Sequence, residues 1–116
     1  KWFKDFLGYS LSKYGMSMCT LGLAEELRES GIGVNSLWPK TMIATAAIEF
    51  NFPKQWLEQA RKSTIMADAV MCVLSKPNSL TAQFLIDEAD LQEAGVIELD
   101  QYAENKSMKL LPDTFL

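Results

Sequence analysis

Tyr9 and Lys13 are the residues of this chain whose types and spacing are most informative about chemistry. They stand four positions apart in the run from Gly8 to Gly15, so on a helix their side chains share one face. A phenol ordinarily ionises near pH ~10, and a neighbouring ammonium favours the phenolate. Such a pair makes the phenol a better proton donor or acceptor near neutral pH.

The same spacing occurs a second time, at Tyr102 and Lys106, in a polar region that reads as a tail. One of the two matches is therefore accidental, and the surroundings favour the first. Small or apolar residues flank Tyr9, a helical pattern continues beyond it, and a strand-like run follows that helix. The alternative interpretation of Tyr9 is an ordinary amphipathic residue on a helix surface.

The composition argues against several classes of binding site and partner. The 116 residues suffice for one small domain, and the net charge of -4 offers no basic surface to nucleic acid or to an acidic membrane. Two cysteines and no histidine argue against a zinc site and exclude His-dependent nucleophilic catalysis. No apolar run reaches the roughly 18 residues that a membrane span needs. We therefore expect no metal, no nucleic-acid partner and no membrane span.

The apolar pattern predicts alternating helices and strands. Gly31 is expected to end the first helix, because glycine enters the left-handed conformation cheaply, and Pro39 to end the first strand. The expected order is a helix over 8–30, a strand over 32–38, a loop with a short helix over 41–50, a flexible substrate-side stretch over 51–62, a helix over 65–75, a strand over 83–87 and a helical turn over 90–94.

The first long helix is expected to carry an apolar stripe along one face, and the second is expected to pack its apolar residues inward. The expected stripe of the first helix comprises Leu11, Tyr14, Met18, Leu21 and Leu27, and that of the second comprises Ala67, Val70, Met71 and Leu74. A helix that runs through a glycine into an apolar strand is typical of an α/β unit with a parallel sheet. Two strands cannot form a stable sheet of this kind alone. We therefore expect the first strands, and the front half of a larger enzyme, to lie outside this sequence.

These residues resemble the short-chain dehydrogenase/reductase family. The run from Tyr9 to Lys13 is similar to its Tyr-x-x-x-Lys motif, and Val34 to Pro39 is similar to the strand and proline turn that follow the motif. Residues 67–70 resemble the late helix of the family and 80–87 its final strand. The resemblance implies the C-terminal half of a Rossmann-like doubly wound parallel sheet over residues 1–102, with 103–116 as tail or linker.

The resemblance also implies roles for single residues. Tyr9 would exchange a proton with a carbonyl or alcohol, while Lys13 would bind the nicotinamide ribose and lower the Tyr9 pKa. The loop that begins at Pro39 would lie against the nicotinamide and pyrophosphate. The residues of this loop that we expect to contact the cofactor are Pro39, Thr41, Ile43 and Thr45.

The chain also departs from the family pattern. The glycine-rich turn that cradles the pyrophosphate has no counterpart here, and the catalytic serine should lie before the first residue. Ser10 and Ser12 cannot replace that serine, because on a helix we expect them to point away from the face of Tyr9. The chain alone is therefore expected not to bind the cofactor.

Two functions remain open at this point. The resemblance implies an NADP- or NAD-dependent oxidoreductase of a lipid-like alcohol or carbonyl, homo-oligomeric when intact and located in peroxisomes or mitochondria. Its substrate pocket could be lined by the apolar residues Trp38, Met42, Ile48, Phe50, Phe52 and Trp56, which could equally be ordinary packing residues. The alternative is a non-catalytic truncated form that acts through dimerisation, with an apolar face on the first helix formed by Leu7, Leu11, Met18, Cys19 and Leu23.

Overall fold

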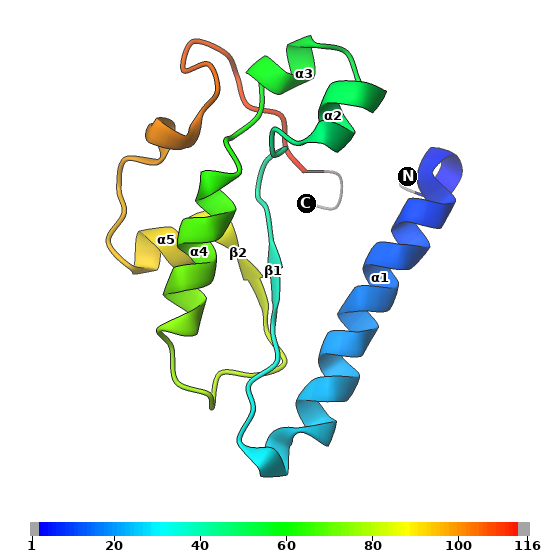
Figure 1. Cartoon of the computed structure of the whole chain (residues 1–116), viewed down its shortest axis with the longest axis vertical. Coiled ribbons are helices and arrows are strands. Elements are labelled where there is room, and N and C mark those ends of the chain that lie inside the picture. The colour runs from blue at the N-terminus through cyan, green and yellow to red at the C-terminus, as the bar shows by residue number, and fades with distance from the viewer. Residues whose placement is uncertain (1–2, 114–116) are drawn as a thin grey trace.

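The computed structural model describes residues 3–113, which form short helices around a pair of strands (Figure 1). The long helix α1 lies beside β1, and α4 and α5 lie on the other side of the strand pair. The small helices α2 and α3 lie together at one end of the molecule (Figure 1). The elements are α1 (Phe3–Glu26), β1 (Ser36–Trp38), α2 (Ala46–Asn51), α3 (Gln55–Glu58), α4 (Thr64–Leu74), β2 (Phe84–Ile86) and α5 (Asp87–Glu93), with 3₁₀ turns at Arg28–Ser30 and Leu99–Tyr102.

The two strands pair in parallel, with Leu37 opposite Leu85. Helix α4 makes the crossover between them, so the parallel α/β order that the sequence predicts is confirmed as part of a Rossmann-like fold. Both strands are shorter than predicted. The residues just before β1 make hydrogen bonds that involve side chains and are not part of the regular strand pairing. The Val34 amide donates to the Thr81 hydroxyl, and the Asn35 side-chain amide donates to the Leu80 carbonyl.

Helix α1 contacts β1 through small residues. Ser10, Thr20 and Ala24 are its buried positions, and the Thr20 hydroxyl hydrogen-bonds the Ser36 hydroxyl of β1. Four members of the predicted apolar stripe, Leu11, Tyr14, Met18 and Leu21, lie on α1 but are exposed in the described part of the chain. Beyond the 3₁₀ turn, Gly31 adopts φ 68°, which confirms the predicted stop.

The first core lies between α4 and α5. Ile65 and Ala69 of α4 pack with Leu91 of α5 and with Leu99 and Tyr102 of the second 3₁₀ turn. The predicted inward face of α4 is wrong, since its members Val70, Met71 and Leu74 are 42%, 63% and 71% exposed. The sequence of α4 is apolar on nearly every side, so its periodicity could not identify the packed face.

The second core lies beneath α2 and α3. Met42, Ile48 and Ala60 are buried there, and the rings of Phe52 and Trp56 stack with their centroids 4.7 Å apart. This core corrects the expectation that residues 51–62 form a flexible excursion. The stretch instead contains α3 and ends in the buried residues Ala60 and Arg61.

Residues 103–113, which the sequence predicts as tail or linker, contact the loop that follows β1. Thr41 and Pro112 form an antiparallel bridge, and the Met42 amide donates to the Leu111 carbonyl at 2.9 Å. The Asp113 amide donates to the Lys40 carbonyl at 3.1 Å. We call Leu111–Asp113 the C-terminal segment; Thr114 to Leu116, also part of the predicted tail, lie outside the described residues.

Two further features concern residues 3–113 alone. Over this range no helix has both the length and the apolar character needed to cross a bilayer. Within the same range no three His, Cys, Asp or Glu side chains are grouped so that they could hold a metal ion.

Candidate active site

Tyr9 and Lys13 lie on one face of α1, as the spacing predicts. The Lys13 Nζ lies over the face of the Tyr9 ring, 5.5 Å from its centre. Tyr9 is 49% exposed, so a molecule in the adjoining space could reach its side chain. The helix bends just before the pair, at Phe6, whose φ of −130° and ψ of 36° are not helical.

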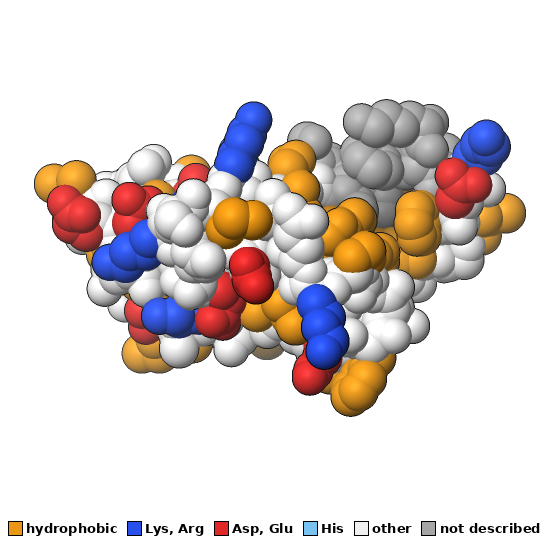
Figure 2. Space-filling model, turned by 90° about the horizontal axis from the view of Figure 1, so that it is seen from above, with side chains coloured by type: hydrophobic (Ala, Val, Ile, Leu, Met, Phe, Trp, Pro, Cys, Tyr) orange, Lys and Arg blue, Asp and Glu red, His pale blue; other side chains and the backbone are white. Residues whose placement is uncertain are grey.

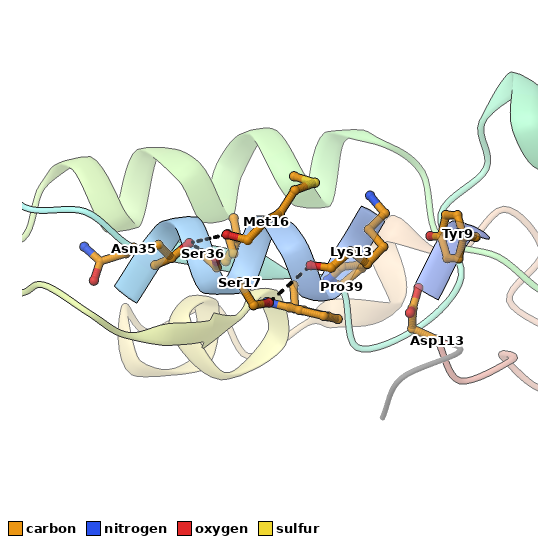
Figure 3. Close-up of a pocket in the computed structure, with 11 residues that line it drawn as sticks. Tyr9, Lys13, Met16, Ser17, Asn35, Ser36, Pro39 and Asp113 are labelled. Atoms are coloured by element: carbon orange, nitrogen blue, oxygen red, sulfur yellow. Dashed lines mark hydrogen bonds between the residues drawn. The ribbon is translucent and has the colours of Figure 1, made fainter. Parts of the chain in front are cut away.

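Two cavities meet at this pair. The first, which we call the β1 cavity, has a volume of about 330 Å³ and a lining that combines polar residues with apolar ones: Ser17, Thr20, Asn35 and Ser36 with Met16, Leu37 and Trp38 (Figure 3). The second, the α2 cavity, has about 560 Å³ and a mainly apolar lining that includes Phe6, Met42, Ile43, Ile48 and Phe52. Four residues line both cavities: Tyr9, Lys13, Pro39 and Asp113.

The predicted cofactor-side residues separate into two groups. Pro39 lines both cavities, and Ile43 and Thr45 line the α2 cavity, so these three lie around the Tyr9–Lys13 pair. Thr41 lines neither cavity. Thr41 is buried, and its backbone forms the β-bridge with Pro112. Its Oγ1 has no hydrogen-bond partner among the described residues.

The electrostatics of Tyr9 differ from the sequence expectation. Partial burial raises the pKa of Tyr9 above its ordinary value, and the negative charge of Asp113 raises it further. The expectation was a pKa lowered by Lys13, whose ammonium lies over the ring face. In this structure the Tyr9 phenol is therefore a weaker acid than the tyrosine–lysine spacing predicts.

Sequence reasoning missed two residues beside Tyr9. Asp113 turns its carboxylate toward Tyr9 in Figure 3, yet it lies far along the chain with no spacing or periodicity to link it to the pair. Ser10 is fully buried and lines the α2 cavity, whereas it was expected to point away from the face of Tyr9. Ser10 could have been identified from the sequence as one of the small residues on the buried side of α1.

The loop after β1 is held in place from α5. Asp87, at the first position of α5, accepts the Lys40 amide at 2.8 Å and the Glu88 amide at 2.7 Å through one oxygen. The Arg61 guanidinium forms an ion pair with Glu88 at 2.7 Å and donates to the Leu99 carbonyl at 2.6 Å.

The Arg61 backbone connects that cluster to the loop. Its amide donates to the Met42 carbonyl at 2.9 Å, and its carbonyl accepts the Ala44 amide at 2.8 Å. The position of Pro39, Ile43 and the rest of the loop thus depends on a buried charged cluster behind it.

The chain is similar to known dehydrogenases. It is 50% identical over 115 residues to hydroxysteroid dehydrogenase-like protein 2 of Danio rerio, and 46% identical over 115 residues to that of Homo sapiens. A solved short-chain dehydrogenase of Mycobacterium thermoresistibile superposes with a TM-score of 0.85 at 39% identity, covering 99% of this chain and 41% of that one. No family model matches the chain.

In sequence and in fold the chain is similar to one part of a short-chain dehydrogenase. Both alignments to the relatives cover 99% of this chain, but it spans only 28% of the zebrafish relative and 27% of the human one. The curated relatives and the solved structure are named as dehydrogenases. The resemblance seen in the sequence is thereby confirmed.

The residues around the two cavities fit one end of such a cofactor. The Lys13 ammonium carries three donors, which suit ribose hydroxyls, and Thr45 adds a hydroxyl nearby. No cradle for a pyrophosphate is formed by glycines within 3–113. Gly33, the one glycine there with crowded surroundings, packs against backbone: a Cβ would lie 2.7 Å from the Leu80 carbonyl oxygen. The described residues therefore offer groups that suit a ribose but no glycine cradle for the phosphates.

Proposed function

We propose that this chain supplies the proton-transfer part of an NADP- or NAD-dependent oxidoreductase that acts on a lipid-like alcohol or carbonyl. One observation carries the proposal: Tyr9 and Lys13 lie where the β1 cavity, which has polar and apolar lining residues, meets the mainly apolar α2 cavity. A reacting oxygen at this junction would contact the Tyr9 hydroxyl while the carbon skeleton extends into the α2 cavity.

The roles follow from the functional groups. The Tyr9 hydroxyl donates its proton to the carbonyl oxygen during reduction and takes it back from the alcohol during oxidation. Lys13 holds the ribose and offsets the negative charge that Tyr9 acquires when it gives up its proton. A nicotinamide, when bound, supplies or accepts the hydride. The residues that would hold its nicotinamide and ribose are Lys13, Pro39, Ile43 and Thr45.

The lining of the α2 cavity supports an apolar substrate. Met42, Ile48 and Phe52, three of the six predicted pocket residues, line this cavity, while Trp56 stacks behind Phe52. Phe50 is 80% exposed, and Trp38 lines the β1 cavity instead. Figure 2 shows hydrophobic side chains gathered on the α1 half of this end of the molecule, with charged side chains mostly on the opposite half.

The substitution Tyr9→Phe in the full-length protein tests this function. We expect kcat to fall by about 100- to 10,000-fold, because general acid–base catalysis contributes on that scale. Cofactor affinity, measured by nucleotide fluorescence, should stay unchanged. The matched control is Tyr14→Phe, since Tyr14 is exposed on the same helix and lines neither cavity.

The readout is nicotinamide absorbance with long-chain and steroid alcohols and ketones as substrates. Turnover retained in Tyr9→Phe would remove Tyr9 from the mechanism. For the 116-residue chain alone we expect no saturable NADPH fluorescence enhancement, because its described residues form no phosphate cradle. Saturation in the micromolar range would contradict that expectation.

A second candidate function is association through α1 without catalysis. Its support is the exposed apolar surface of this helix, which includes Leu7, Leu11, Met18 and Leu23. Sedimentation velocity of the chain and of its Leu11→Lys and Met18→Lys variants tests this candidate. A dimer that both variants dissociate favours it, and a monomeric parent chain excludes it.

A further inference from the structure

The two cavities contain a pair of opposite charges. Among the described residues that line either cavity, Lys13 and Asp113 are the only charged ones, and each lines both. They come from distant parts of the chain, Lys13 from α1 and Asp113 from the C-terminal segment. Tyr9 lies with them at the junction and is the remaining titratable group of the lining.

Backbone contacts hold the C-terminal segment against this site. Thr41 and Pro112 form an antiparallel bridge. On either side of the bridge, the Met42 amide donates to the Leu111 carbonyl and the Asp113 amide donates to the Lys40 carbonyl. The segment therefore lies like a short strand along the loop that leads from Pro39 into the α2 cavity, and Asp113 is the residue that it presents to Tyr9 (Figure 3).

The other polar residues that line the two cavities carry no charge. Among the residues described here they are Ser10, Ser17, Thr20, Asn35, Ser36, Thr45 and Asn51. Within the described part of the chain, the charges that face the phenol are therefore those of Lys13 and Asp113, which act in opposite directions. The Asp113 carboxylate adds to burial in raising the pKa of Tyr9.

We propose that Asp113 is a positioning residue of this site: its carboxylate opposes the charge of Lys13 and keeps Tyr9 in the protonated, proton-donating form. The inference rests on the proposed role of Tyr9 and deepens it. It follows that the C-terminal segment completes the site, and that carbonyl reduction extends to higher pH than Tyr9 and Lys13 alone would allow.

The test is Asp113→Asn in the full-length protein, a change that removes the charge and keeps the shape. We expect the pKa of Tyr9 to fall, because the negative charge that helps to raise it is removed. The phenolate absorbance of Tyr9 is isolated as the difference between each protein and its Tyr9→Phe counterpart. The alkaline limb of kcat/KM for reduction should move to lower pH by the same amount.

Two further variants serve as controls. Asp113→Glu retains the charge and should keep the Tyr9 titration of the parent protein. Asp100→Asn removes an exposed carboxylate that lines neither cavity and should also leave it unchanged. Asp113→Ser replaces the Asn variant if circular dichroism shows that the latter does not fold.

An unchanged Tyr9 titration in the neutral variants would overturn the proposal. A failure of this proposal can be distinguished from a failure of the proposed function, because the absorbance titration of Tyr9 requires no turnover. If Tyr9→Phe keeps its activity but Asp113→Asn still lowers the Tyr9 pKa, the proposed function fails while the electrostatic coupling stands. If Tyr9→Phe is inactive and the titration does not move, the coupling alone fails.

Discussion

The Tyr102 hydroxyl donates a hydrogen bond to the Asp68 carboxylate at 2.7 Å, which joins the second 3₁₀ turn to α4. Burial, followed by this bond, raises the pKa of Tyr102 to about 12. Tyr102 is 6% exposed and ends a 3₁₀ turn, so it shares no helix face with Lys106. The second tyrosine–lysine spacing is therefore accidental, and its tyrosine is part of the core.

The substitution Tyr102→Phe should lower the free energy of unfolding by about 1 kcal/mol at pH 7, the usual net worth of one such bond. Because the folded pKa lies above the unfolded value near 10, this tyrosine's contribution is fully present below pH ~10 and is lost as the pH rises through about 12. Urea unfolding at pH 7 and pH 11 measures both effects. Tyr14→Phe is the control, and equal losses for both variants at pH 7 would contradict the prediction.

The sequence predicts the order of the elements and the proximity of Tyr9 and Lys13, but it does not predict which face of α4 is packed. The helix end at Gly31 and the parallel α/β order follow from residue types and apolar patterns that can be recognised in the sequence. The packed face of α4 depends on which of several apolar sides meets Leu91, and that is decided by tertiary packing. Asp113 joins the site through backbone pairing with Lys40, which no spacing in the sequence encodes.

Two glycine substitutions should have opposite effects on stability. Gly31 adopts φ +68°, where a Cβ is disfavoured, so Gly31→Ala should destabilise the protein by about 1 kcal/mol. Gly22 lies exposed inside α1 with open space at its Cβ position, so Gly22→Ala should stabilise it by about 0.5–1 kcal/mol. Thermal unfolding of the two variants measures the difference. Shifts of the same sign would contradict the conformations assigned to these residues.

The buried carboxylate of Asp87 should make stability depend on pH. Burial raises the pKa of Asp87, and this outweighs the lowering by the amide hydrogen bonds from Lys40 and Glu88. A raised folded pKa means that the contribution of this group is fully present below the unfolded pKa near 4 and is lost as the pH rises through the folded value. Asp87→Asn removes that titration, so the variant should gain stability relative to the parent between pH 4 and pH 7.

The midpoints of urea unfolding at pH 4 and pH 7 measure this gain in stability. The control is Asp100→Asn, which changes an exposed carboxylate. A constant difference between Asp87→Asn and the parent would show that Asp87 does not titrate in this range. Asp87→Ala should cost more than Asp87→Asn at either pH, because it also removes the oxygen that accepts the Lys40 and Glu88 amides.

The ion pair between Arg61 and Glu88 should contribute far more to stability than the surface pair between Arg28 and Glu25. Arg61 is 5% exposed, so Arg61→Met would leave the Glu88 carboxylate and the Leu99 carbonyl without this donor. We expect a loss of about 3–5 kcal/mol, as for other broken buried pairs. Arg28→Met removes a pair of similar length on the exposed surface and should cost less than about 1 kcal/mol.

Arg61→Lys separates charge from geometry at this position. A lysine keeps the charge but cannot donate at once to Glu88 and to the Leu99 carbonyl in the forked arrangement of arginine. Its stability, measured by urea unfolding, should therefore lie between those of the parent and Arg61→Met. Because the Arg61 backbone also pairs with Met42 and Ala44, both variants should weaken cofactor binding more than Arg28→Met does. Cofactor affinity equal to that of the parent in both Arg61 variants would show that the loop after β1 does not depend on this cluster.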